Sequence, residues 1–390
     1  MRLFFHFLAC PQYSWRRWLA VPTNFTGHER MHNLIKHQRR SPFRIGPGGR
    51  QPKSALLARL LTVSLVVTAL LVPLTASSAA TVQDGRLRGY TVKEATHSLV
   101  YVANAAAHSV SVIDTDANAT VRTIDVGRTP VGVAVTPDGQ RVYVTDLGLS
   151  EVSVIDTTTN AVIRTISVGN APIGVAVAPD GRRAYVTNEG SGDLSVIDTS
   201  TDTVLDTIGV GIAPTGVAVT PDGRRVYVTN FGSNSVSVID TNTNAAVTIG
   251  VGPAPSSVAI TPDGRFAYEA NAGAGVLSMT DTGTNTVSTY LTVGNRPANV
   301  AITSDGRFAY VTNLGANTVS VIDTNTKTVV ATIDVGLQPF GVSVAPNGRR
   351  VYVTLQGSHS VAVINTDNNT VAGTIDVGEA PSGVAVATRP

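Results

Sequence analysis

The sequence predicts an all-β protein, a seven-bladed β-propeller with four antiparallel strands in each blade. Its strongest sign is a repeated unit whose marker tyrosine, in segments such as V-Y-V-T-N, recurs every 41 or 42 residues. Each unit also contains four short apolar runs rich in β-branched residues. A fixed period in the forties with four strand-like runs is typical of propeller blades. The seven marker residues are Tyr101, Tyr143, Tyr185, Tyr227, Tyr268, Tyr310 and Tyr352.

One copy, from Gly216 to Gly252, shows how the unit forms four strands. A Thr-Pro-Asp-Gly segment at 220–223 predicts a tight hairpin after the first strand, because Pro presets φ and Gly accepts a positive φ. Segments rich in Asn, Asp and Gly follow the second and third strands and predict two further reversals. The expected strands, A to D in chain order, are 217–219, 226–228, 236–239 and 247–249.

Counting the A strands predicts how the ring closes. Tyr101 has no clean A strand before it, whereas the last A strand, 383–386, has no blade after it. We therefore expect the C-terminal strand to complete the N-terminal blade as its innermost strand. A weaker alternative is 90–93, which lacks the Pro-Asp-Gly turn. The seven A strands are 132–135, 174–177, 216–219, 257–260, 299–302, 341–344 and 383–386.

The repeated motifs resemble a known family. V-Y-V-T-N, S-V-S-V-I-D-T, T-I-x-V-G and P-x-G-V-A-V-T-P-D-G are similar to the YVTN family of β-propeller repeats, found in surface-layer and exported proteins. The resemblance covers about residues 99–390. It implies the propeller fold and leaves the activity open, since related propellers act as lactonases, lyases, electron-transfer domains or binding modules.

The N-terminal part differs in composition from the repeats. A basic segment precedes an apolar run at 60–72 and small residues up to Ala80, the order of a secretory signal peptide cleaved after Ala79 or Ala80. The apolar run is short for a membrane span, so we expect no span in the mature chain and a secreted or cell-surface location. The expected parts are an unstructured extension at 1–54 with a start codon placed too early, a signal peptide at 55–80, a linker or degenerate strand at 81–98, and the propeller at 99–390.

Removal of the leader changes the charge. The first 80 residues hold 11 basic and 1 acidic residue, so the remaining part has 18 basic and 26 acidic residues and a net charge of −8. An acidic propeller argues against general nucleic-acid binding. The only cysteine, Cys10, lies in the leader, which excludes disulfides and thiolate chemistry in the propeller. We expect a monomer without a cofactor.

Residues that recur in every copy are best explained by the fold. The repeated tyrosines are expected to pack between blades. The aspartate after strand C is expected to accept backbone N–H groups in the turn between strands C and D, since blade seven has Asn365 there and Asn lacks the charge of a metal ligand. No metal site is therefore expected. These aspartates are Asp114, Asp156, Asp198, Asp240, Asp281 and Asp323.

Departures from the repeat are the candidate site residues. The B–C loops and the D-to-A crossovers of a propeller emerge on one face, around the mouth of the central channel, where ligands bind. Candidate ligand-binding residues are Arg128, Arg296, Phe340 and Glu379 on the crossovers and His108, Glu189, Asp193 and His359 on the loops. Other exceptions are Asn170, Gln338, Asp146, Glu151, Phe231 and Gln356.

Two of these candidates are histidines at equivalent places in adjacent blades. His108 and His359 each follow their marker tyrosine by seven residues, and Glu379 lies on the crossover that joins their blades. Together they could form a zinc-like or acid–base site. The alternative is that each histidine replaces a turn asparagine at a loop tip.

Several function classes are excluded by missing residues. After the leader there is no Trp to stack on a quinone or a sugar and no C-x-x-C-H for haem attachment. There is also no G-x-S-x-G nucleophile elbow and no phosphate-binding Gly motif. Because the copies are so regular, the leading hypothesis is an exported, non-catalytic module that binds an unknown protein or cell-envelope ligand. The alternative is a lactonase-like or lyase-like enzyme with a site at the channel mouth. Single-stranded DNA binding is a third possibility, disfavoured by the negative charge.

Overall fold

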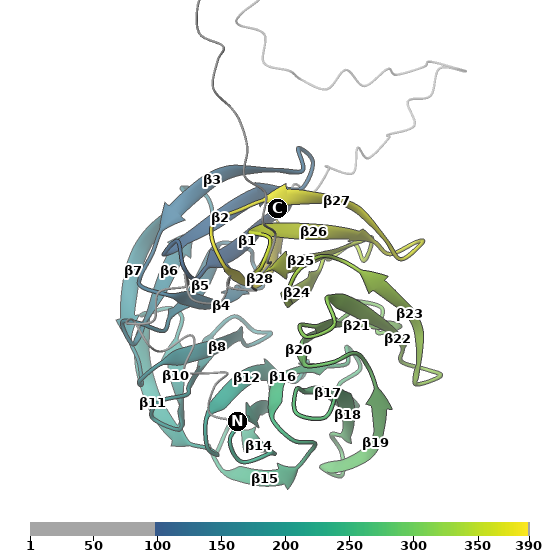
Figure 1. Cartoon of the computed structure of the whole chain (residues 1–390). Helices are drawn as coiled ribbons and strands as arrows, with labels where there is room; N and C mark the ends of the chain where they lie inside the picture. Colours follow the sequence, from purple (N-terminus) through teal and green to yellow (C-terminus); the bar gives the residue numbers. More distant parts are fainter. Residues whose placement is uncertain (1–97, 389–390) are drawn as a thin grey trace, which may run out of the picture. The chain divides into compact units, whose positions relative to one another are not determined.

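The computed structural model describes residues 98–388, which form a ring of seven four-stranded antiparallel sheets (Figure 1). This confirms the predicted propeller. Blade 1 combines β28, β1, β2 and β3, and blades 2 to 7 each use four consecutive strands, from β4–β7 to β24–β27. In Figure 1 the A strands surround the central channel and the D strands form the outer edge.

The strand boundaries repeat closely from blade to blade. The strands are β1 (Ser98–Asn104), β2 (Ser109–Asp114), β3 (Ala119–Asp125), β4 (Pro130–Val135), β5 (Arg141–Asp146), β6 (Glu151–Asp156), β7 (Ala161–Ser167), β8 (Pro172–Val177), β9 (Arg183–Asn188), β10 (Asp193–Asp198), β11 (Thr203–Gly209), β12 (Pro214–Val219), β13 (Arg225–Asn230), β14 (Ser235–Asp240), β15 (Ala246–Gly250), β16 (Pro255–Ile260), β17 (Phe266–Asn271), β18 (Val276–Asp281), β19 (Thr286–Thr292), β20 (Pro297–Ile302), β21 (Phe308–Asn313), β22 (Thr318–Asp323), β23 (Thr328–Asp334), β24 (Pro339–Val344), β25 (Arg350–Leu355), β26 (Ser360–Asn365), β27 (Thr370–Asp376) and β28 (Pro381–Thr388).

The hydrophobic core lies between neighbouring blades. Strands B and C are buried on both faces, whereas most of strand D is exposed. In one such cluster, Tyr227 and Val236 of blade 4 pack with Val258 and Ala267 of blade 5. Each sheet therefore buries its apolar faces only because another sheet lies on each side, which is why the repeats must form a closed ring.

The C-terminal strand closes the ring as predicted. Strand β28 pairs antiparallel with β1, and Val384, Ala385 and Val386 lie opposite Val102, Tyr101 and Val100. Figure 1 shows this yellow strand beside the blue strand β1 at the channel. The alternative strand at 90–93 lies outside the described residues.

The repeated tyrosines pack between blades, which confirms the prediction for them. Their rings are buried. The Tyr101 hydroxyl donates to Asn160 Oδ1 (2.7 Å) and the Tyr143 hydroxyl donates to Asp202 Oδ1 (2.8 Å), each in the C–D turn of the next blade. Arg141 Nη1 adds a bond to the carbonyl of Thr199 in that turn (2.7 Å). These contacts link successive blades on the face opposite the B–C loops.

The turn predictions are also confirmed. Asp281 Oδ1 accepts the N–H groups of Gly283 and Thr284, both at 2.9 Å, and these donors hold the pKa of Asp281 below its usual value. Asn365 Oδ1 accepts the N–H of Asp367 at 2.8 Å in the same way. In the A–B hairpin of blade 4, Gly223 has φ +71°, as a tight turn there requires.

The predictions for the N-terminal extension, the signal peptide and the linker at 81–98 concern residues outside the described part, apart from Ser98, which begins β1. In the part of the chain that the structure describes, no helix is long and apolar enough to cross a membrane.

Candidate functional site

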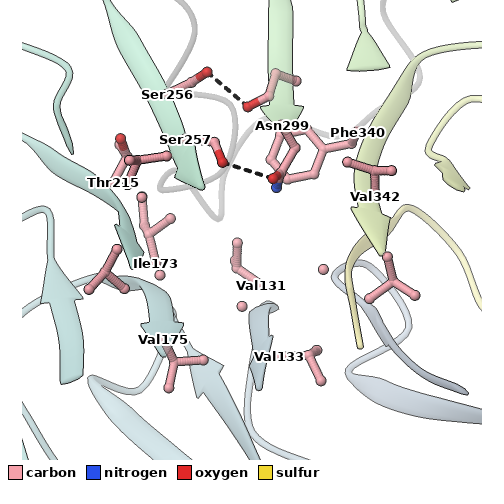
Figure 2. Close-up of a pocket in the computed structure, with 18 of the residues that line it drawn as sticks. Val131, Val133, Ile173, Val175, Thr215, Ser256, Ser257, Asn299, Phe340 and Val342 are labelled. Carbon is pink, nitrogen blue, oxygen red and sulfur yellow. Dashed lines mark hydrogen bonds between the residues drawn. The ribbon is translucent and has the colours of Figure 1, made fainter. Parts of the chain in front are cut away.

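A cavity of about 230 Å³ lies at the centre of the ring, where the A strands meet (Figure 2). Most of the side chains that line it are apolar, and Arg296 is the one charged residue among them. The apolar side chains are those of Val131, Val133, Ile173, Val175, Val217, Val258, Ala272, Pro297, Ala298, Phe340, Val342 and Val384. The polar side chains are those of Thr215, Ser256, Ser257, Arg296 and Asn299.

Close approach of the A strands requires glycine in most blades. A Cβ added at Gly132 would lie 2.3 Å from the carbonyl oxygen of Ile173 in the next blade, and one at Gly174 would lie 2.3 Å from that of Thr215. A side chain at either of these two positions would therefore clash with the next blade. Five blades have glycine there, and the two exceptions are Ser257 in blade 5 and Asn299 in blade 6, which add polar side chains to one side of the channel.

Ser257 and Asn299 form a polar pair across these two blades. Ser257 Oγ donates to Asn299 Oδ1 at 2.8 Å, and the backbone N–H of Val300 donates to the same oxygen at 2.9 Å. Both donors fix the amide so that its Nδ2 group points away from them. Asn299 Nδ2 makes no hydrogen bond with the described residues, and Figure 2 shows it on the open side of the channel. It is a preoriented donor for a ligand oxygen.

The rim of the channel is built by the B–C loops and the crossovers, as predicted. In blade 3 the N–H of Glu189 donates to the carbonyl of Ala171 (3.0 Å). At the equivalent place in blade 2, Leu147 packs against Val131 and Ile173, which both line the cavity. The repeat therefore puts Glu189 at the mouth of the channel.

Glu189 has the properties of a proton acceptor. Its side chain is half-buried and makes no hydrogen bond or ion pair with the described residues. Burial raises the pKa of the Glu189 carboxyl to about 7. A carboxylate with a pKa near the operating pH is suited to general acid–base chemistry.

Two other carboxyl groups lie inside blades and, like Glu189, are not among the residues that line the cavity. Ser153 Oγ donates to Asp146 Oδ2 (2.6 Å), and burial raises the pKa of Asp146 to about 6. Ser278 Oγ donates to Glu269 Oε2 (2.7 Å), and burial raises the pKa of Glu269 to about 8.

Comparison with protein families identifies the class of this propeller. The family described as Lactonase, 7-bladed beta-propeller matches residues 75–290 and 266–387, well over half of the chain. The chain belongs to this lactonase family. The search of curated proteins found no match to this chain.

Solved structures share the fold of this lactonase-family propeller. Hydrazine synthase from Kuenenia stuttgartiensis is 24% identical with a TM-score of 0.64, over 72% of this chain and 99% of that chain. A putative 6-phosphogluconolactonase from Bacteroides fragilis is 16% identical with a TM-score of 0.65, over 77% of this chain and all of that chain. One from Bacteroides uniformis is 16% identical with a TM-score of 0.64, over 75% of this chain and all of that chain. At such identities the likeness shows the fold alone.

The family match corrects the leading functional hypothesis. A non-catalytic binding module is wrong, because membership of the lactonase family points to a hydrolytic enzyme, the alternative weighed from the sequence. The regular repeats misled because the changes in the channel wall are single side chains, such as Ser257 and Asn299, within otherwise unchanged copies. The resemblance to surface-layer proteins, and a protein or cell-envelope partner, stay predictions.

The two predicted histidines have a structural role in this lactonase-family propeller. His108 Nδ1 accepts the N–H of Thr129 and His359 Nδ1 accepts the N–H of Ala380, both at 3.1 Å. Asn234 Oδ1 accepts the N–H of Ala254 in the same place, at 2.8 Å. Each histidine therefore replaces a turn asparagine. Among residues 98–388 no three His, Cys, Asp or Glu side chains are placed to share a metal ion, so no zinc-like site is formed with Glu379.

The other predicted residues divide between the rim and the channel. Arg128 and Glu379 lie on crossovers, where their carbonyls accept the N–H groups of Gly148 (2.9 Å) and Ala106 (3.2 Å). Asp193 Oδ1 accepts the amide of Asn188 at 2.6 Å, inside the loop of blade 3.

Arg296 and Phe340 line the cavity itself, with Ser257 and Asn299, which sequence reasoning missed. The loss of glycine from two of the seven A strands, S-V-A-I and N-V-A-I in place of G-V-A-V, was the signal that could have found the missed pair.

Proposed function

We propose that this protein is a hydrolase that opens a lactone ring at the mouth of the propeller channel. The observation that carries the proposal is the lactonase-family match, which covers the propeller up to residue 387. Two of the similar structures are described as putative 6-phosphogluconolactonases, which supports a lactone as the substrate.

Donors for the lactone carbonyl come from blade 6 and its crossover. Asn299 Nδ2 and the Arg296 guanidinium both belong to the cavity lining, and each can donate to the carbonyl oxygen as negative charge develops on it. Preoriented donors stabilise an oxyanion more strongly than water does. These two residues therefore bind and polarise the acyl group.

Glu189 supplies the base at the rim. Its carboxylate accepts a proton from water while the water oxygen forms a bond to the carbonyl carbon. The ring C–O bond then breaks, and the proton on Glu189 passes to the departing alkoxide. One water is consumed and the product is a hydroxy acid, so Glu189 returns to its ionised form.

The test is hydrolysis of alkyl, aryl and sugar lactones by the purified protein, followed by proton release in a pH-stat. We expect turnover above the spontaneous rate for at least one class. Asn299→Gly, which installs the residue of the five other blades, should lower kcat by about 10²-fold to 10³-fold. His359→Asn, a change in a rim turn, is the matched control and should keep full activity. No acceleration across the panel would overturn the proposal.

We also propose that the enzyme acts outside the cytoplasm. The basic, apolar and small-residue segments between Lys53 and Ala80 support export. N-terminal sequencing of protein recovered from the producing cells should begin at residue 80 or 81. A chain that retains the apolar run 60–72 would argue against a cleaved signal.

A further inference from the structure

We infer that the substrate is an apolar lactone, whose ring carries an alkyl or aryl arm, and that phosphorylated sugar lactones are poor substrates. This inference rests on the proposed function and names the substrate class of the same site. It follows from the hydrogen-bonding capacity of the channel and from the chemistry of its wall.

The polar side chains that line the channel are few, and several are already bonded within the protein. The hydroxyl hydrogen of Ser257 is already donated to Asn299 Oδ1 (2.8 Å), and Ser256 Oγ bonds the carbonyl of Ala298 (2.8 Å). Thr215 Oγ1 lies within bonding distance of Thr229 Oγ1 (3.0 Å) and the Pro255 carbonyl (3.3 Å). Asn299 Nδ2 is a donor that a ligand can use. The Arg296 guanidinium already interacts within the protein but carries several N–H groups, and together the two residues suit one acyl group.

A phosphorylated sugar lactone needs much more than this. Its phosphate requires several charge-assisted donors, and Arg296 is the one cation that lines the cavity. Its ring hydroxyls would be buried without partners, which costs binding energy for each group. The channel therefore discriminates against the polyhydroxylated substrate.

The wall suits an apolar arm instead. One residue after the glycine position, the A strands of four blades contribute Val133, Val175, Val217 and Val342 to the cavity wall. Figure 2 shows Val133, Val175 and Val342 around the channel, with the Ser257–Asn299 pair at another part of its wall. A lactone held by its carbonyl at Asn299 can place its arm along these valines. Each methylene group of the arm buried there should improve binding by about fourfold.

Exposed apolar side chains also lie on part of the rim. Ile212 on the crossover into blade 4 is 69% exposed, and Pro253 on the next crossover is exposed. Phe231 lies on the B–C loop of blade 4, where its N–H donates to the Ala213 carbonyl at 2.9 Å. The crossovers into blades 1 and 2 instead carry Glu379 and Arg128. A longer arm can lie against these apolar residues of the rim.

The test is a series of γ-lactones with alkyl arms of increasing length, compared with glucono-δ-lactone and its 6-phosphate. We expect kcat/KM to rise about fourfold per methylene group until the cavity is filled. The two sugar lactones should be hydrolysed at least a hundredfold less efficiently than the best alkyl lactone. A rate that is independent of arm length, or a preference for the phosphorylated sugar lactone, would overturn the inference.

A binding measurement separates this inference from the proposed function. The corresponding γ-lactams resist hydrolysis, and their affinities can be measured by calorimetry. Lactam affinity that rises with arm length, without turnover of any lactone, would overturn the proposed function and keep the apolar specificity. Lactam affinity that does not depend on arm length would overturn the specificity, whatever the turnover.

Matched variants on strand β8 locate the arm. Val175→Thr adds a hydroxyl to the cavity wall at nearly constant volume, whereas Val177→Thr makes the same change at a position that does not line the cavity. We expect Val175→Thr to reduce the gain per methylene group and Val177→Thr to preserve it. Equal thermal midpoints of the two variants would show that the difference does not come from folding. An unchanged gain in Val175→Thr would place the arm elsewhere and contradict the inference.

Discussion

Ser278 Oγ donates a hydrogen bond to Glu269 Oε2 over 2.7 Å, and the two residues lie opposite each other on strands β18 and β17 of blade 5. Six other blades have valine at the position of Glu269. The valine of blade 4, Val228, packs against Tyr185 of blade 3, so the repeat places the carboxyl of Glu269 between blades 4 and 5. Burial raises the pKa of Glu269 to about 8.

The first prediction is that stability falls with rising pH because of Glu269. Its pKa is about 8 in the folded chain against 4.5 for the ordinary side chain, so the neutral form is favoured by folding. The stabilisation is fully present below pH 4.5 and is lost as the pH rises through about 8, by at most about 5 kcal/mol. Urea unfolding at pH 5, 7 and 9 measures this change.

Variants of blade 5 test the assignment. Glu269→Val with Thr280→Ile installs the pair found in most other blades, and we expect it to flatten the pH dependence and raise stability at pH 9. Glu379→Gln, at an exposed rim position, is the control and should retain the dependence of the parent protein. A parent protein equally stable at pH 5 and pH 9 would contradict the prediction.

The second prediction concerns the link between blades 2 and 3. Asp202 accepts the Tyr143 hydroxyl at 2.8 Å and lies 3.3 Å from Arg141 Nη1. Asp202→Ala removes the partner of a buried hydroxyl and should cost about 2 to 4 kcal/mol of unfolding free energy. Asp202→Asn installs the residue that Tyr101 bonds in the preceding link, Asn160, and should cost less than about 1 kcal/mol. Equal losses in the two variants would show that the hydroxyl bond contributes nothing.

The third prediction concerns the closing strand. Deletion of residues 379–390 removes β28 and leaves Val100 and Val102 of β1 without their register partners. We expect the shortened chain to aggregate or to unfold at a much lower temperature, because without β28 the ring is open and the edge of β1 is exposed. A synthetic peptide of residues 379–390 should restore the thermal midpoint by adding the missing strand. A shortened chain as stable as the parent, with no response to the peptide, would rule out this role.

The fold could be predicted almost completely, because every blade repeats the same turn and strand motifs. The Pro-Asp-Gly hairpins, the Asp-closed turns and the marker tyrosines each depend on residues close in sequence, and seven copies leave little ambiguity. Even closure followed from counting, since 383–386 had no other place to pair.

The site was harder to predict, because the role of its residues depends on contacts between neighbouring blades, which the repeat of a single blade does not contain. Asn299 differs from its equivalents by one side chain, and its importance comes from the pair with Ser257 in the next blade and from the narrow gap that glycine fills elsewhere. His108 and His359 stood out by residue type, yet they bond backbone N–H groups as asparagine does. Unusual residue types were thus a poorer guide than lost glycines.

The fourth prediction is that Glu189 sets the pH dependence of catalysis. Since the base must be ionised, and burial raises the pKa of Glu189 to about 7, kcat/KM should rise with pH and level off above about pH 7. Glu189→Gln should lower kcat by about 10²-fold to 10⁴-fold and abolish this dependence. Glu151→Gln, at the start of strand β6 in blade 2, is the matched control and should leave both unchanged. Rates in Glu189→Gln that still fall below pH 7 would assign the base to another residue.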